Sequence, residues 1–198
     1  RAAASQHPTP AGVALAAVTA GLALGLLAKV LTVSGRRKEL SPHVATLESL
    51  TAAAAAASER MLRLADEDSA AFEGYLAARR LPCSTEAQHV ERLRVLACAV
   101  HQAISVPLEA AQEAAAGLRL CSDAGDLTPA ALIADLGVAA TLLASALRAF
   151  LLCAQSNVRQ LAPDAASYRE RLAAEKERQE RALRLAQAVL ERAAVAGS

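Results

Sequence analysis

Apolar residues recur every three or four positions along most of the chain, a spacing that places them on one face of an α-helix. Strict alternation of apolar and polar residues, which is typical of strands, is missing. We expect Pro107 to break or kink one of the helices, because proline has no backbone N–H. The pattern predicts an all-α fold, an antiparallel bundle of five or six helices. The predicted helices cover residues 11–33, 41–80, 84–104, 107–121, 130–156 and 165–194.

Residues 1–10 are polar and contain two prolines, so we expect an N-terminal arm or linker there, followed by one helical domain over 11–198. The chain starts with Arg1 rather than Met, which indicates processing, a cut, or a piece of a longer protein.

The composition excludes some classes of partner. With 21 basic and 20 acidic residues and only 2% aromatic residues, the chain offers no basic, aromatic surface, and we expect no nucleic acid partner. The four cysteines form no C-x-x-C pair, which favours reduced thiols in a cytoplasmic protein. Cys98 and His101 lie one turn apart, but no second ligand pair accompanies them, so we expect no metal.

Two segments, 11–33 and 130–154, are apolar enough to suggest a membrane protein with two spanning helices. Both are rich in alanine, however, and both contain charged residues. The first segment contains Lys29, and the second contains Asp135 and Arg148. Helices that are apolar all round also form the centre of soluble bundles. We therefore favour a soluble protein over a membrane protein.

One acidic residue interrupts an apolar helix face. Met61, Leu64, Asp68, Phe72 and Tyr75 share one face of the second predicted helix. Such an aspartate has a purely structural explanation if it pairs with an arginine or lies at the solvent-exposed edge of the apolar face. Alternatively, burial raises the pKa of its carboxyl group and makes it an acid–base catalyst.

Several motifs occur in the order found in one family of folate enzymes. They are PTPAG (8–12), LTVSGRRKE (31–39), LADEDSAAFEGYLAARRLP (64–82), SVPLEAA (105–111), ADLGVAA (134–140) and NVRQLAPDAASY (157–168). Together they span nearly the whole chain, and the segment 64–82 is the most specific. On these motifs the sequence resembles the cyclodeaminase/cyclohydrolase family, which includes the C-terminal domain of formiminotransferase-cyclodeaminase and bacterial methenyltetrahydrofolate cyclohydrolases.

The resemblance implies a cytoplasmic homodimer that acts on a tetrahydrofolate derivative as its substrate, without a metal. Its reaction would form or hydrolyse 5,10-methenyltetrahydrofolate, either as a formiminotetrahydrofolate cyclodeaminase, which releases ammonia, or as a cyclohydrolase. The motifs do not separate these two activities.

The resemblance also implies site residues. Asp68 and Asp135 stand at catalytic positions. Alternatively, Asp135 has only a structural role, as a polar residue that forms hydrogen bonds inside the bundle. Arg36, Arg37 and Lys38 match a basic run that would meet the anionic tail of a folate, with one or several glutamates, or would simply form a solvated turn. The implied substrate-binding set also contains Gly12, Asn157 and Asp164, of which Asn157 is alternatively a helix stop and Asp164 a helix cap.

Some family markers are altered. The glycine run before the first helix is reduced to Pro10-Ala11-Gly12-Val13, and Ala134 and Cys153 replace a usual Ser and a usual Asn. The alternative to a folate enzyme is therefore a catalytically weak or inactive member that serves as a helical dimerisation or scaffold domain.

Overall fold

Five long α-helices make up most of the chain in a computed structural model that describes residues 11–161 and 165–196. They are α1 (Gly12–Ser34), α2 (Val44–Arg79), α3 (Glu86–Ala124), α4 (Ile133–Leu161) and α5 (Ala166–Ala196). Short 3₁₀ turns precede α2 (η2, Lys38–His43) and join α3 to α4 (η3, Gly125–Leu127; η4, Ala130–Leu132). The described ranges contain no strand, so the predicted all-α bundle is confirmed. The arm predicted over residues 1–10 lies outside them.

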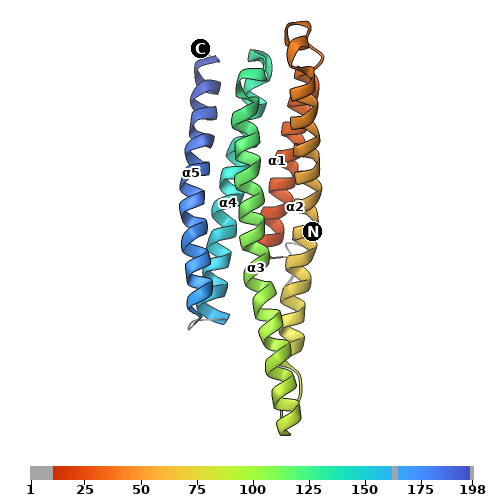
Figure 1. Cartoon of the computed structure of the whole chain (residues 1–198), viewed down its shortest axis with the longest axis vertical. Helices are drawn as coiled ribbons and strands as arrows, with labels where there is room; N and C mark the ends of the chain where they lie inside the picture. The colour runs from red at the N-terminus through yellow and green to blue at the C-terminus, as the bar shows by residue number, and fades with distance from the viewer. Residues whose placement is uncertain (1–10, 162–164, 197–198) are drawn as a thin grey trace.

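Each helix runs opposite to the one before it, and α1 packs against both α2 and α4 (Figure 1). The joined ends of α2 and α3, which have 36 and 39 residues, extend beyond the other helices as a two-helix arm (Figure 1). Asp68 lies on α2 beside the start of α1, at the end of the bundle from which this arm leaves. We call this the Asp68 end, and the opposite end, where α1 stops before Arg36, the Arg36 end.

Small residues allow α1 to lie deep in the bundle. Ala17, Ala20 and Leu24 are fully buried. The Ser58 hydroxyl donates a 2.8 Å hydrogen bond to the carbonyl of Gly21, and a Cβ on Gly21 would lie 3.3 Å from Leu62 Cδ2. The backbones of α1 and α2 are therefore in close contact at Gly21.

The two apolar segments belong to this packed bundle. By length and composition alone, Gly12–Ser34 and Ala130–Leu161 are able to cross a membrane, with hydropathies of 2.1 and 1.9. About half of each apolar window, 56% and 50% of its residues, is buried inside the protein. Packing against other helices thus accounts for about half of the apolar positions in these windows.

The break expected at Pro107 does not occur. α3 is one continuous helix of 39 residues with Pro107 inside it, so the prediction of separate helices over 84–104 and 107–121 is wrong. Proline leaves the carbonyl of Ala103, four residues earlier, without its usual helical donor. The side chain of Asn157 on α4 donates to that carbonyl instead, at 2.8 Å.

α5 is rich in charged residues, and it packs against α3 and α4. Its one buried charge among the described residues is Glu175, which is 2% exposed and whose Oε2 accepts hydrogen bonds from Gln112 and Arg178. Its buried apolar residues are Leu172, Ala182, Ala186 and Val189.

Candidate functional site

Asp68 is half-buried, and its carboxyl group accepts a hydrogen bond from the backbone N–H of Ala14. Ala14 lies in the first turn of α1, where N–H groups lack helical partners and the helix dipole favours a negative charge. Burial outweighs this bond and raises the pKa of Asp68 from 3.8 to about 6. Asp68 can therefore both hold and release a proton near neutral pH.

The apolar face of α2 accounts for part of the predicted burial of the Asp68 carboxyl group. Met61 and Leu64 are fully buried, whereas Phe72, one turn beyond Asp68, is 39% exposed. The later part of α2 continues into the two-helix arm, away from the body of the bundle (Figure 1). The start of α1 closes another side of Asp68.

A thiol on α4 closes a third side. A Cβ on Gly12 would lie 3.3 Å from Cys153 Sγ, so the thiol packs directly on the first turn of α1. Burial raises the pKa of Cys153, and the negative charge of Asp68 raises it further. The thiol therefore stays protonated at neutral pH. Three helices thus bring together Gly12, Asp68 and Cys153.

Asn157 lies on α4 one turn after Cys153, on the same side of the bundle as Asp68. It continues α4, which runs to Leu161, so the alternative that Asn157 is a helix stop is wrong. Its amide nitrogen is bound to the Ala103 carbonyl of α3. Asp164, the other residue predicted in this segment, lies outside the described residues.

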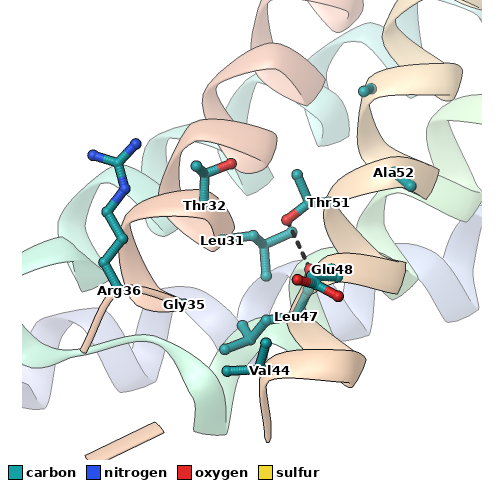
Figure 2. Close-up of a pocket in the computed structure, with 10 residues that line it drawn as sticks. Leu31, Thr32, Gly35, Arg36, Val44, Leu47, Glu48, Thr51 and Ala52 are labelled. Atoms are coloured by element: carbon teal, nitrogen blue, oxygen red, sulfur yellow. Dashed lines mark hydrogen bonds between the residues drawn. The ribbon is translucent and has the colours of Figure 1, made fainter. Parts of the chain in front are cut away.

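The basic run lies at the Arg36 end. Arg36 stands at the rim of a hollow of about 440 Å³, with its guanidinium pointing away from Leu31, Leu47 and Val44 (Figure 2). Glu48 and Thr51 add polar groups to the same hollow. Within one chain α1 separates this run from Asp68 by about 30 Å, because a helix rises 1.5 Å per residue.

Arg37 and Lys38 do not share the hollow of Arg36. Arg37 lines a second hollow, of about 400 Å³, together with residues 126–129 and Ala131. Lys38 begins η2 and is exposed. The three cations therefore face different surroundings within one chain.

Asp135 also lies far from Asp68. It is half-buried in the first turn of α4, next to the η3–η4 connection that Arg37 contacts. Cys153, which lies close to Asp68, comes 18 residues after Asp135, or about 27 Å further along α4. The predicted catalytic pair of Asp68 and Asp135 is thus not brought together within one chain.

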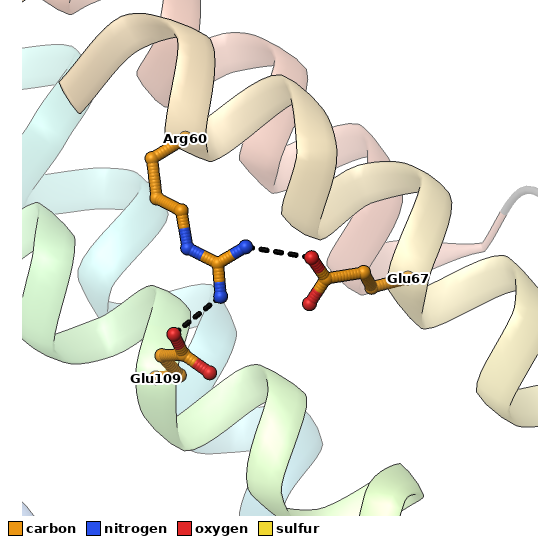
Figure 3. Close-up of polar contacts among 3 residues, drawn as sticks. All are labelled: Arg60, Glu67 and Glu109. Carbon is orange, nitrogen blue, oxygen red and sulfur yellow. Dashed lines mark hydrogen bonds and ion pairs between the residues drawn. The ribbon is translucent and has the colours of Figure 1, made fainter. Parts of the chain in front are cut away.

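Sequence reasoning overlooked an ion-pair network next to Asp68. Arg60 on α2 binds Glu67 at 2.6 Å and also binds Glu109 on α3, so it joins the two helices (Figure 3). These carboxylates raise the pKa of the Arg60 guanidinium above its usual value. Arg60 and Glu67 are seven residues apart, and Glu109 lies on another helix. No short sequence motif therefore predicts the network.

The described residues contain no group of three or more His, Cys, Asp or Glu side chains placed to hold a metal ion. His101, which the sequence paired with Cys98, has its Nδ1 2.9 Å from the Tyr168 hydroxyl of α5. What the site at the Asp68 end offers chemically is a carboxylic acid that titrates near neutral pH beside a neutral thiol and a helix N-terminus.

Comparison with known proteins agrees with this arrangement. A formimidoyltransferase-cyclodeaminase from Sus scrofa is 32% identical over 111 residues, which are 56% of this chain and 20% of that protein. The match thus spans about a fifth of the relative's length. The crystal structure of formiminotetrahydrofolate cyclodeaminase from Thermotoga maritima has the same fold, with a TM-score of 0.80, 21% identity, and coverage of 95% of this chain and 91% of that one.

The five-helix bundle thus has the all-helical fold of that cyclodeaminase. The family model described as formiminotransferase-cyclodeaminase matches residues 1–178. The chain belongs to the formiminotransferase-cyclodeaminase family.

Proposed function

We propose that the protein acts in folate-dependent one-carbon metabolism, as a formiminotetrahydrofolate cyclodeaminase that forms 5,10-methenyltetrahydrofolate. The observation that carries the proposal is the half-buried carboxyl group of Asp68, with a pKa of about 6, at the start of α1. The deaminase is favoured over the hydrolase because both named relatives are cyclodeaminases. The fold supports a soluble, cytoplasmic enzyme, since its most apolar helices pack within the bundle.

In the proposed reaction Asp68 is the acid–base group. The secondary amine that closes the ring attacks the carbon of the protonated formimino group, forms a carbon–nitrogen bond and loses a proton. The former formimino nitrogen, now an NH2 group, gains a proton and leaves as ammonia as its own bond to that carbon breaks. A carboxyl group with a pKa near 6 can accept the first proton and donate the second. Gly12 allows the start of α1 to approach Cys153 closely, because a Cβ there would lie only 3.3 Å from Sγ.

The experiment is an assay with N-formiminotetrahydrofolate, in which methenyltetrahydrofolate is followed by its near-ultraviolet absorbance. Asp68→Asn is expected to lower kcat by about 10²- to 10⁴-fold, the usual contribution of a positioned acid or base. Asp66→Asn, which changes an exposed acid two residues away, is the matched control and should retain activity. No turnover by the wild-type protein would reject the enzyme in favour of a scaffold domain, and equal turnover by Asp68→Asn would reject Asp68 as the acid–base group.

We further propose that the protein is a homodimer formed through α1 and α4. Three large apolar residues of α1 are exposed at helical spacing, namely Leu15 (56%), Val18 (40%) and Leu22 (69%). On the neighbouring α4, Val138 and Leu152 are 48% and 69% exposed. Large exposed apolar residues on two neighbouring helices are typical of an interface, and a two-fold axis would pair such a surface with itself.

The dimer also bears on the substrate site. If the two α1 helices pair in opposite directions near Leu22, the Arg36 end of one chain meets the Asp68 end of the other. Arg36 and Asp135 of one chain would then contribute to the site that contains Asp68 of the other chain. In that site the basic run would face the anionic folate tail.

Complementation tests this arrangement. Asp68→Asn and Arg36→Glu are each expected to lower activity, and a refolded mixture of the two should recover about a quarter of the wild-type rate, because statistical assortment leaves one intact composite site in half of the dimers. No recovery from a mixture that light scattering shows to be dimeric would refute the shared site. A monomer at micromolar concentration would refute the dimer.

A further inference from the structure

α3 continues through Pro107 although one of its backbone hydrogen bonds is missing. In an α-helix the carbonyl of residue 103 accepts from the N–H of residue 107, and proline has no N–H. Ala103 is only 7% exposed, so bulk water has little access to this part of the backbone. A buried carbonyl without a donor destabilises the fold, and such groups are almost always paired.

The missing donor comes from another helix. Asn157 Nδ2 donates to the Ala103 carbonyl at 2.8 Å, which is an ordinary length for this bond. Asn157 is itself half-buried on α4. Its amide therefore replaces the N–H that Pro107 lacks, and the same bond ties α3 to α4.

This bond lies next to the candidate site. Cys153, one turn before Asn157, packs on Gly12 at the start of α1. The same turn of α1 donates the Ala14 N–H to Asp68. A shift or rotation of α4 at this level would therefore move the thiol that packs beside Asp68.

We propose that Asn157 is a positioning residue rather than a substrate ligand, and that Pro107 is its partner. The amide holds α4 against α3 and so fixes Cys153 against the start of α1. One of its two amide N–H groups is committed to the Ala103 carbonyl, and this bond fixes the orientation of the side chain against α3. For its effect on catalysis this inference rests on the proposed function, whereas its effect on stability does not.

A double-mutant cycle tests the pairing. Asn157→Ala alone should raise the equilibrium constant of unfolding about 5- to 150-fold, the usual effect of leaving a buried polar group without a partner. In a Pro107→Ala background, the substituted alanine provides the missing N–H, and Asn157→Ala should then change the constant less than about 3-fold. Gln160→Ala, an exposed amide on the same helix, is the control and should change it little.

An equal loss in both backgrounds would overturn the proposal. If Asn157→Ala does not fold, folding of the Pro107→Ala/Asn157→Ala protein supports the pairing, and failure of both proteins to fold refutes it.

Turnover separates positioning from substrate binding. Asn157→Ala is expected to lower kcat with little change in KM, and Pro107→Ala/Asn157→Ala should return kcat to within about 3-fold of the Pro107→Ala value, because the carbonyl is satisfied again. A double variant as slow as Asn157→Ala would show that the amide contacts substrate. If the wild-type protein itself shows no turnover, the proposed function fails, and the unfolding cycle still decides the pairing of Asn157 with Pro107.

Discussion

Asp68→Asn is expected to stabilise the folded protein at neutral and alkaline pH. Burial raises the pKa of Asp68 from 3.8 to about 6, which means that the folded state disfavours the ionised carboxylate. One pKa unit corresponds to about 1.36 kcal/mol, so ionisation costs the fold at most about 3 kcal/mol, and less once solvent screening of this half-buried group is included. Asparagine carries no charge, and its side-chain oxygen can still accept the hydrogen bond from Ala14.

The stabilisation by Asp68→Asn should depend on pH in a defined way. Below pH 3.8 the carboxyl group is protonated in both the folded and the unfolded state, and its full contribution to stability is present. That contribution is lost as the pH rises through the folded pKa of about 6. With these two pKa values, the loss is small at pH 4, grows through pH 5 and levels off above pH 6 at no more than about 3 kcal/mol, because solvent screening reduces it.

Urea unfolding followed by far-ultraviolet circular dichroism measures this difference, since the chain has no Trp and only two Tyr. Protein concentration must be fixed, because dimerisation would add to the apparent stability. Asp66→Asn is the control and should show no such trend, since Asp66 is exposed. An advantage of Asp68→Asn that stays constant between pH 4 and pH 8, or a wild type that is the more stable protein at pH 8, would refute the burial argument.

Three further predictions concern residues away from Asp68. Gly117→Ala should destabilise the protein by about 1–3 kcal/mol in thermal unfolding, because the added Cβ would lie 2.9 Å from Leu24 Cδ2; an unchanged Tm would contradict this packing. Iodoacetamide should modify the exposed Cys83 and Cys98 first and leave Cys121 intact in the folded protein, since burial raises the pKa of the Cys121 thiol to about 12; mass spectrometry checks the order. Arg60→Met should cost no more than about 1 kcal/mol in urea unfolding, because both glutamates of its ion pairs remain in contact with water; a larger loss would show that the pairs are effectively buried.

Local patterns in the sequence are sufficient to predict most helices. The first helix is predicted over 11–33 and observed over Gly12–Ser34, because an apolar run and the Ser34-Gly35 stop both act locally. The start of α3 is likewise local, since Thr85 and Gln88 form the capping box that begins it. Asp68 is found in the same way, as a charge on an apolar helix face.

Features that depend on contacts between helices cannot be predicted in this way. Pro107 indicates a break, and the donor that keeps α3 continuous comes from Asn157 on another helix. Cys153 stands out in the sequence only as a substitution, because its packing on Gly12 joins residues that are far apart along the chain. The distance between Asp68 and Arg36 follows from the length of α1, but sequence similarity alone placed both in one site.

That distance makes the oligomeric state decisive for the mechanism. α1 connects the two ends of the bundle, with the amide partner of Asp68 at its start and Arg36 just after its end. A ligand that contacted both within one chain would have to span about 30 Å. A site built from a single chain therefore relies on Asp68, Gly12 and Cys153 without the basic run. Any effect of Arg36 on the same turnover then requires a second chain whose α1 runs in the opposite direction, for which the exposed row from Leu15 to Leu22 provides the surface. A dilution series makes the distinction, because loss of activity by Arg36→Glu should disappear in the monomer, and a monomer that stayed sensitive to this change would break the argument.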